Sequence, residues 1–213
     1  GDWSSDVCSS DLLMVNMSVS SVLPTPQEVK ASFPLSTDDI KCVENHRQSI
    51  RQILSGESSK KLFIFGPCSV HSEEEILTYA QDFLSLQKLV EDKFVCVLRV
   101  YIEKPRSCLG WKGMLYDPDL DGSSDLSKGL FQCRRLLSKL VKMKLAIAVE
   151  FLEPVISNYF EDLVSWASVG ARTSPSQIHR QMASGLLSPI GFKNAVCGNV
   201  ETACSAVLRS EEH

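Results

Sequence analysis

A cysteine follows directly after an apolar run in the stretch LFIFGPCSV, residues 62–70. The run stops at Gly66 and Pro67, so Cys68 stands where a buried strand would leave the core. A thiol at that place could be a small core residue, a redox centre or a metal ligand. No C-x-x-C pair occurs in the chain, which argues against a zinc site or a thioredoxin-like centre. Most of the other cysteines are interpreted as small buried residues in a reducing cytoplasm.

Basic side chains follow the later apolar runs in the same way. Five of them come from three run ends and one long polar loop: Arg99, Lys104, Arg106, Arg172 and Lys193. An acidic residue, Glu150, lies near the end of another run. Such a group of cations is costly to bring together unless an anion neutralises it, and guanidinium groups bind phosphate or carboxylate in a bidentate way. The pattern therefore predicts a ligand with several negative charges, such as a small phosphorylated acid.

Short apolar runs alternate with longer helical patterns, and together they must position these side chains. Strands are predicted at 62–66, 94–100, 146–152, 168–171 and 189–193. Helices are predicted at 26–33, 37–54, 72–90, 126–143, 158–167, 176–185 and 200–208. Two helices therefore precede the first strand, and one helix follows each strand.

The strands are continuous apolar runs, as expected of parallel strands that are covered on both faces. No G-x-G-x-x-G follows the first strand, which weakens the dinucleotide-binding alternative. We therefore predict an α/β protein, a (β/α)8 TIM barrel truncated after about five βα units and preceded by an N-terminal helical extension. In a barrel the carboxyl ends of the strands meet at one face, so the cations would converge there.

The two ends of the chain have the character of foreign sequence. The end of GDWSSDVCSSDL and the terminal RSEEH can be back-translated onto the two strands of one oligonucleotide, as expected of a sequencing adapter. Such segments are set aside before the fold is considered. The predicted division is 1–12 adapter-derived, 13–58 N-terminal helical extension, 59–208 partial TIM barrel and 209–213 adapter-derived.

Composition excludes several classes of protein. The 213 residues are 44% hydrophobic and 23% charged, which is ordinary for a globular domain. The net charge of −4 becomes zero without the end segments, because 21 of the 22 basic and 21 of the 26 acidic residues remain. We therefore expect no nonspecific binding to nucleic acid. No apolar run approaches the roughly 20 residues of a membrane span, so a cytoplasmic protein that does not bind membranes is expected.

Five motifs together resemble one enzyme family. They are GPCSVH, RVYIEKPRS, GWKG, GARTSPSQIHRQMASGL and GFKN. In this order and spacing they are similar to the 3-deoxy-D-arabino-heptulosonate 7-phosphate (DAHP) synthases, in the short microbial class I form with an N-terminal extension. The resemblance covers nearly all of residues 20–208. It implies a (β/α)8 barrel, a divalent metal, and the condensation of phosphoenolpyruvate with erythrose 4-phosphate that opens the shikimate pathway to chorismate and the aromatic amino acids.

The resemblance also implies roles for individual residues. Cys68 matches the family's metal-binding cysteine. The positions that bind phosphoenolpyruvate match Arg99, Lys104, Glu150, Arg172 and Lys193, with Lys104 and Glu150 as the expected catalytic residues. Arg106 and Ser107 match the segment that binds the phosphate of the aldose, where the family usually has threonine in place of this serine. Lys112 is expected to line the same region.

The implied cofactor is a divalent metal ion: Mn, Fe, Co or Zn. In the family its other ligands are a histidine, a glutamate and an aspartate from later strands, and those segments do not occur in this sequence. A catalytic metal site needs about three protein ligands and an open position. The chain by itself is therefore expected to be inactive, and the complete protein active.

Regulation and assembly are implied by the same resemblance. In the family a surface pocket near the exit of the third strand binds an aromatic amino acid, and the matching positions here are Glu153, Pro154, Ser157, Asn158 and Leu187. The best-known forms have serine at the position of Leu187. Whether the effector is Phe, Tyr, Trp or none stays open, and a homo-oligomer is expected.

Three other functions stay open at this point. The first is the sister enzyme that joins phosphoenolpyruvate to arabinose 5-phosphate, 3-deoxy-D-manno-octulosonate 8-phosphate synthase. The second is a Schiff-base aldolase with Lys193 as its nucleophile. The third is a non-catalytic barrel that binds an aromatic amino acid.

Overall fold

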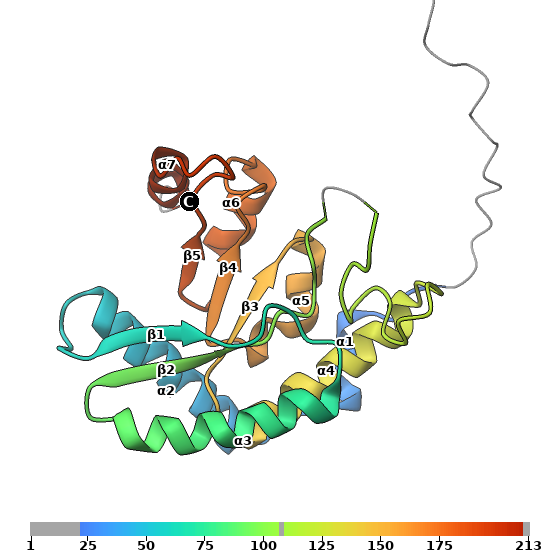
Figure 1. The fold of residues 1–213 in the computed structure, drawn as a ribbon, viewed down its shortest axis with the longest axis horizontal. Coiled ribbons are helices and arrows are strands. Elements are labelled where there is room, and N and C mark those ends of the chain that lie inside the picture. Colours follow the sequence, from blue (N-terminus) through green and yellow to red (C-terminus); the bar gives the residue numbers. More distant parts are fainter. Residues whose placement is uncertain (1–21, 107–108, 211–213) are drawn as a thin grey trace, which may run out of the picture.

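The computed structural model describes residues 22–106 and 109–210, whose arrangement is shown in Figure 1. Its strands are β1 (Lys61–Phe65), β2 (Phe94–Arg99), β3 (Ile147–Phe151), β4 (Trp166–Val169) and β5 (Ile190–Phe192). The α-helices are α1 (Pro26–Ser32), α2 (Thr37–Leu54), α3 (Glu73–Val90), α4 (Leu126–Lys142), α5 (Ser157–Phe160), α6 (Gln177–Gly185) and α7 (Glu201–Ser210). Two 3-10 helices, η1 (Pro154–Ile156) and η2 (Glu161–Leu163), flank α5.

The five strands form one parallel sheet in the order β1-β2-β3-β4-β5. In Figure 1 they turn from nearly horizontal in β1 and β2 to nearly vertical in β4 and β5, so the sheet curls into part of a barrel. Neighbouring parallel strands twist relative to one another, and this twist favours such a curl. The predicted α/β fold of five βα units is confirmed.

Strand alternation divides the apolar residues between the two faces of the sheet. Cys96 and Leu98 of β2 belong to the main core, together with apolar residues of α3 and α4. Val97 and Ala148 belong to a smaller cluster on the other, inner face, and Ile50 of α2 packs against them. Burying an isoleucine completely contributes about 1.5–3 kcal/mol, so this contact helps to hold the N-terminal helices against the sheet.

The N-terminal helices begin where their sequence predicts. Thr25 and Ser36 cap α1 and α2, and in α2 the capping is reciprocal, since Asp39 N donates to Ser36 Oγ at 3.1 Å and Ser36 N donates to Asp39 Oδ2 at 3.2 Å. Further along α2, the buried Arg47 donates from Nε to the carbonyl oxygen of Val164 at 3.0 Å. This bond joins the α2 helix to the segment that leads into β4.

The helix predicted at 158–167 is wrong in its second half. The chain forms η1, α5 and η2 in succession, and β4 begins at Trp166, two residues before the predicted strand. The neighbouring strand explains the difference, because Ser165 N donates to Ile147 O at 2.9 Å and Trp166 pairs with Ala148 of β3. Pairing with β3 therefore overrides the local helical pattern.

The expectation that most cysteines are buried is also wrong for the described part of the chain. Cys96 and Cys133 are buried, whereas Cys68, Cys197 and Cys204 are exposed and Cys42 is half-buried. The exposed thiols lie after strands or on a helix surface, outside the apolar runs. None of the described helices has the length and apolar composition of a membrane span.

Parts of the predicted domain division lie outside the described residues. This holds for residues 1–12 and 211–213 of the expected adapter-derived segments. The backbone of α7 continues to Ser210, two residues beyond the predicted helix end at 208. Ser107, expected to bind the aldose phosphate, also lies outside the described residues.

Candidate anion-binding site at the carboxyl ends of the strands

The period of two along a strand places the polar strand-end residues on the inner face of the curled sheet. Arg99 follows Val97 by two positions, and Glu150 follows Ala148 by two positions. Since Val97 and Ala148 lie in the inner cluster, the same side of the sheet carries Arg99 and Glu150. The apolar part of this face is therefore continued by polar residues toward the carboxyl ends of the strands.

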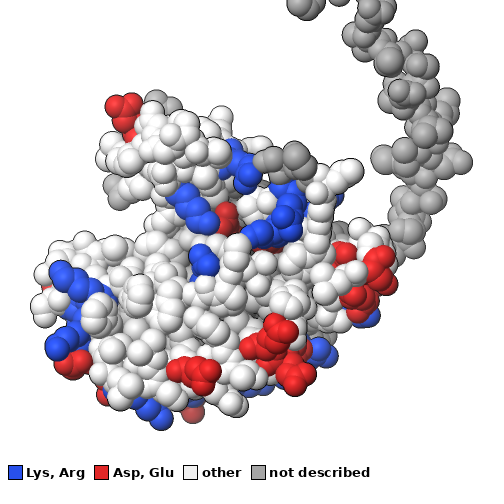
Figure 2. All heavy atoms as spheres, in the orientation of Figure 1, with Lys and Arg blue, Asp and Glu red and all other residues white. Residues whose placement is uncertain are grey.

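Lysine and arginine side chains gather in a hollow of the molecule, between the β1–β2 half of the sheet and its β4–β5 end, as Figure 2 shows. Acidic side chains in that view lie mostly outside the hollow, below and beside it. An electropositive concave surface of this kind concentrates anions.

Tyr101 lies close to two of the cations, although the sequence did not single it out. The guanidinium carbon of Arg99 is 5.3 Å from the centroid of the Tyr101 ring, and Lys193 Nζ is 4.8 Å from the same centroid. The tyrosine is buried, with 8% of its surface exposed. Both distances are within the reach of a cation–π interaction. The only sequence signal was its position, two residues after Arg99 in the alternating pattern.

Arg99 is also fixed by the backbone that leaves β1. Its Nε donates to Pro67 O at 2.9 Å, and its Nη2 donates to Gly66 O at 2.8 Å. Gly66 has a φ of +153°, and a Cβ at this residue would lie 2.7 Å from the carbonyl oxygen of Arg99. Glycine is therefore required for this close approach of the two chains.

Glu150 and Lys193 form an ion pair across the mouth of the sheet. Lys193 Nζ donates to Glu150 Oε2, and the side chain of Glu150 is only 4% exposed while that of Lys193 is 41% exposed. Next to this pair, a Cβ at Gly170 would lie 2.6 Å from Glu150 Oε1. The glycine that follows β4 thus leaves room for the carboxylate. A buried carboxylate is costly in a protein unless a cation pairs with it.

Cys68 and Lys104 make a second charged contact on the same side. Lys104 Nζ donates a hydrogen bond to Cys68 Sγ, and this bond is the largest cause that lowers the pKa of the exposed thiol. The charges of Lys104, Arg99 and Lys193 act in the same direction, against the effect of burial. The position favours the thiolate, which is the form that binds metals and attacks electrophiles.

The structure thus brings together five of the expected site residues: Cys68, Arg99, Lys104, Glu150 and Lys193. The remaining described ones are exposed: Arg106, Lys112 and Arg172. Arg106 Nε donates to Trp111 O at 2.8 Å, so its side chain folds back on its own loop. The backbone of Lys112 accepts from Lys104 N at 2.8 Å, which braces the start of that loop.

Glu103 is a second residue that the sequence did not single out. It is 1% exposed, and its Oε2 accepts from Leu152 N at 2.7 Å and from Glu153 N at 3.3 Å. Burial raises its pKa to about 8, and the nearby Glu153 and Glu150 add to the rise. The carbonyl of the same Leu152 lies 2.8 Å from His179 Nε2. Glu103 therefore links the exits of β2 and β3, and its raised pKa favours the protonated form of its carboxyl group.

The described residues provide only part of a metal site. A thiolate at Cys68 is a suitable donor for a soft divalent metal. In the described ranges, no group of three or more His, Cys, Asp or Glu side chains is arranged to hold a metal ion. His71 Nε2 lies 3.3 Å from Glu75 Oε2, and His179 contacts Leu152 and Ser176, so the contacts of both histidines are with residues other than Cys68. The residues present therefore do not form a metal site by themselves.

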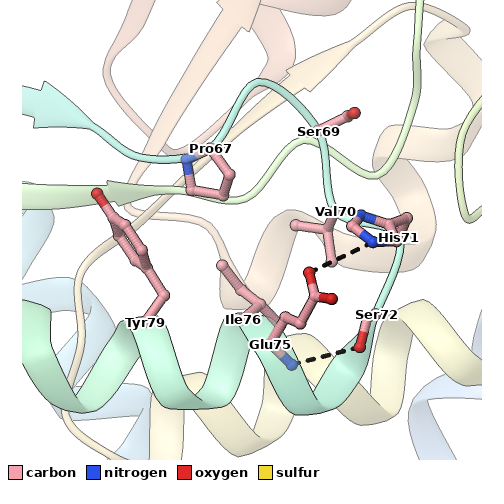
Figure 3. Close-up of a pocket in the computed structure, with 8 residues that line it drawn as sticks. All are labelled: Pro67, Ser69, Val70, His71, Ser72, Glu75, Ile76 and Tyr79. Carbon is pink, nitrogen blue, oxygen red and sulfur yellow. Dashed lines mark hydrogen bonds and ion pairs between the residues drawn. The ribbon is translucent and has the colours of Figure 1, made fainter.

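A pocket of about 130 Å³ lies on the other side of the segment that leaves β1, between this segment and the start of α3. Figure 3 shows its lining, in which the carboxylate of Glu75 faces His71 and the backbone N–H of Glu75 donates to Ser72. Its eight lining residues include none of the expected site residues. The pocket is therefore separate from the convergent cations.

The chain matches known proteins over most of its length. Residues 32–213 match the family model described as the DAHP synthetase I family. The chain is 46% identical, over 193 residues, to the Tyr-sensitive phospho-2-dehydro-3-deoxyheptonate aldolase of Escherichia coli K12. It is 44% identical, over 185 residues, to the Trp-sensitive enzyme of Enterobacter agglomerans. These matches cover 91% and 87% of this chain and 54% and 53% of the relatives.

A solved structure agrees with these sequence matches. The phospho-2-dehydro-3-deoxyheptonate aldolase of Francisella tularensis SCHU S4 superimposes with a TM-score of 0.89 and is 39% identical. The match covers 93% of this chain and 58% of that one. The chain spans about half the length of the curated relatives it matches. Because the family model matches most of the residues, this chain belongs to the DAHP synthetase I family.

Proposed function

We propose that the complete protein containing this chain condenses phosphoenolpyruvate with erythrose 4-phosphate and water to give DAHP and inorganic phosphate. The observation that carries the proposal is the group of Arg99, Lys104 and Lys193 around Tyr101, Cys68 and Glu150. Phosphoenolpyruvate carries a phosphate and a carboxylate on the same carbon, C2. Its two anionic groups match a compact site with several cations from separate strand exits.

The residues of this chain would act mainly by binding and orienting phosphoenolpyruvate. Arg99, Lys193 and Arg172 are proposed to hold its phosphate and carboxylate, so that C3 faces the aldehyde carbon of the aldose. The positive charges stabilise the phosphate as water adds at C2 and the C–O bond to phosphate breaks. We propose Lys104 and Glu150 as the catalytic residues, with Glu150 orienting Lys193 through their ion pair.

The aldose would lie beyond the Lys104 side of the site. Arg106 and Ser107 are proposed to bind the phosphate of erythrose 4-phosphate, with Lys112 nearby. Arg106 in this structure bonds to its own loop, so it would have to leave Trp111 O in order to reach a phosphate. The exposed position of this side chain permits such a movement.

We further propose that Cys68 is one ligand of a divalent metal, which as a Lewis acid would polarise the aldehyde. The lowered pKa of the Cys68 thiol supports this role. Further ligands would come from residues outside the described part of this chain, in which no group of three or more His, Cys, Asp or Glu side chains could hold a metal ion. Metal analysis of the purified complete protein would identify the metal.

An aromatic amino acid is the proposed effector, because relatives carry the names Tyr-sensitive and Trp-sensitive. The proposed contact positions are Glu153, Pro154, Ser157, Asn158 and Leu187, all on the segment after β3 or at the end of α6. Leu187 is 64% exposed, and its backbone N–H donates to Glu161 Oε1 at 2.8 Å. The backbone there is held while the side chain stays available to a ligand. A homo-oligomeric assembly is proposed with it.

The activity is tested on the complete protein, purified with its metal. Release of inorganic phosphate and formation of a seven-carbon product are measured with phosphoenolpyruvate and erythrose 4-phosphate, and arabinose 5-phosphate serves as the competing aldose. Product is expected with the four-carbon aldose. Faster turnover of arabinose 5-phosphate would replace the proposal by the sister synthase. If neither aldose leads to phosphate release, the remaining alternative is the non-catalytic barrel that binds an aromatic amino acid.

The Schiff-base alternative has its own test. A Schiff-base lysine must offer a neutral amine to the carbonyl carbon, whereas the Lys193 amine is held in an ion pair by Glu150. Treatment of the complete protein with borohydride in the presence of substrate is expected to leave Lys193 unmodified in the mass spectrum. A stable substrate adduct on Lys193 would favour the aldolase.

A further inference from the structure

The ring of Tyr101 contacts two cationic side chains of the site. Two cations from different strands lie within 5.3 Å and 4.8 Å of its centroid, Arg99 from β2 and Lys193 from the end of β5. Its backbone carbonyl accepts from Val70 N at 2.9 Å, which ties the ring to the loop that carries Cys68. Tyr101 is thus the common neighbour of three strand exits.

Two like charges on one small surface repel each other, and each side chain has other rotamers that would separate them. Arg99 is held by two backbone carbonyls, and Lys193 by one carboxylate. The electron-rich face of an aromatic ring attracts cations without donating or accepting a proton. The ring can therefore keep Arg99 and Lys193 together without neutralising them. Both remain available to an anion.

The ring, and not the hydroxyl group, has the closer partners. Tyr101 Oη lies 3.5 Å from Ser168 Oγ, at the outer limit of a hydrogen bond. That hydroxyl of Ser168 already accepts from Trp166 Nε1 at 3.1 Å. Loss of the Tyr101 hydroxyl group should therefore have little effect on the positions of Arg99 and Lys193, whereas loss of the ring should displace them.

We propose that Tyr101 is a positioning residue that holds Arg99 and Lys193 in the orientation that binds phosphoenolpyruvate. The inference rests on the proposed function for the identity of the ligand. Tyr101 acts through the two cations and does not itself touch the reacting atoms. Its effect should therefore fall on the binding of phosphoenolpyruvate, more than on the aldose or on the chemical step.

The test compares variants of the complete protein that keep or remove the ring. Y101F keeps the ring, while Y101L and Y101M replace it with smaller aliphatic side chains. F83L is the matched control, because Phe83 is buried and stacks on Phe65 at a centroid distance of 4.7 Å, on α3 and away from the cations. Thermal melting of each variant shows which ones are folded, and having two variants without the ring guards against one that does not fold.

The expected result is a selective loss of phosphoenolpyruvate binding. In Y101L and Y101M, KM for phosphoenolpyruvate should rise about tenfold, as two cation–π contacts together imply. KM for erythrose 4-phosphate and kcat should stay within about threefold, and Y101F and F83L should resemble the unmodified protein in all three. Calorimetric titration with phosphoenolpyruvate alone should give the same ratio of Kd values without turnover.

Other outcomes would overturn the inference. Equal losses in Y101F and Y101L would assign the effect to the hydroxyl group, and unchanged phosphoenolpyruvate binding in a folded Y101L or Y101M would remove the role altogether. An equal loss of phosphoenolpyruvate binding in F83L would mean that Tyr101 acts only as a core residue. If the unmodified protein binds phosphoenolpyruvate but forms no product, the proposed reaction fails while the titrations still decide the role of Tyr101.

Discussion

Lys193 Nζ donates to Glu150 Oε2 across the width of β4, because Glu150 lies on β3 and Lys193 directly follows β5. In the register, Ser168 of β4 pairs with Glu150 on one side and with Gly191 on the other, and Lys193 lies two residues beyond Gly191. Small residues on β4 and β5 thus let a carboxylate on one strand reach an ammonium two strands away.

Replacing Glu150 should weaken the proposed reaction without unfolding the protein. In Glu150→Gln the amide oxygen can still accept from Lys193, but the charge is lost, and a hydrogen bond to a charged group contributes about 1.5–3 kcal/mol. We expect kcat/KM for phosphoenolpyruvate to fall about 10- to 100-fold, as measured by steady-state kinetics on the complete protein. Glu74→Gln, on the exposed first turn of α3, is the control and should stay within twofold.

The buried Glu103 should make stability depend on alkaline pH. Its folded-state pKa is raised to about 8, so the folded protein holds a proton that the unfolded chain releases above its usual pKa of 4.5. The resulting stability is complete below pH 4.5 and is lost as the pH rises toward 8. Between pH 5 and pH 8 the loss should be about 3 kcal/mol. Urea unfolding midpoints of the complete protein measure it.

The Glu103→Gln variant should remove most of this dependence, because an amide can accept from Leu152 N as the neutral acid does and does not ionise. Glu74→Gln, a change of the same chemical type at an exposed position, should keep the dependence of the unmodified protein. An unchanged pH profile in Glu103→Gln would mean that another group causes it.

Asp39 should make stability depend on acidic pH, in the opposite sense. A hydrogen bond from Lys144 Nζ at 2.9 Å, then one from Ser36, lowers its pKa to about 2. The stability that it contributes is present above its unfolded pKa of 3.8 and is lost as the pH falls through 2. The loss should be about 2 kcal/mol. The Asp39→Asn variant should show this loss of stability already at pH 7, as a lower melting temperature. Asp38 is exposed in the same turn, so Asp38→Asn should change the melting temperature little.

Asp162 should be needed to keep a buried guanidinium paired. Arg134 is 1% exposed and donates from Nη1 and Nη2 to the two carboxylate oxygens of Asp162, at 2.5 Å and 2.7 Å. Asp162→Asn leaves the buried cation without its counter-charge, and about 2 kcal/mol of stability should be lost after allowance for the partial exposure of Asp162. The measurement is the urea midpoint of the complete protein.

The matched control for that pair is Asp119→Asn, which breaks the surface ion pair between Asp119 and Lys128. Both of its side chains are exposed to solvent, which screens the pair, so the loss of stability should be much smaller than in Asp162→Asn. Comparable losses of stability in Asp162→Asn and Asp119→Asn would show that the burial of Arg134 does not determine how much stability is lost.

Local sequence patterns were sufficient for most of the secondary structure. The apolar runs at 62–66 and 94–100 became β1 and β2 within one residue at each end, and Ser36 and Ser72 cap helices that begin one residue later. Local information was not sufficient for 158–167, where pairing with β3 turned the last residues of a helical pattern into β4. Strand pairing is a long-range contact, so it does not appear in the periodicity of a single segment.

The amino-acid sequence by itself determined the parallel βα order and the placing of Cys68, Arg99, Glu150 and Lys193 near strand ends, because both follow from periods of two and 3.6 residues along the chain. Only the tertiary structure decided that Lys104 pairs with Cys68, 36 residues away, and that the Tyr101 ring lies close to two cations. Such contacts depend on the curl of the sheet and on glycines that admit close approach, and neither is encoded in the spacing of charged residues.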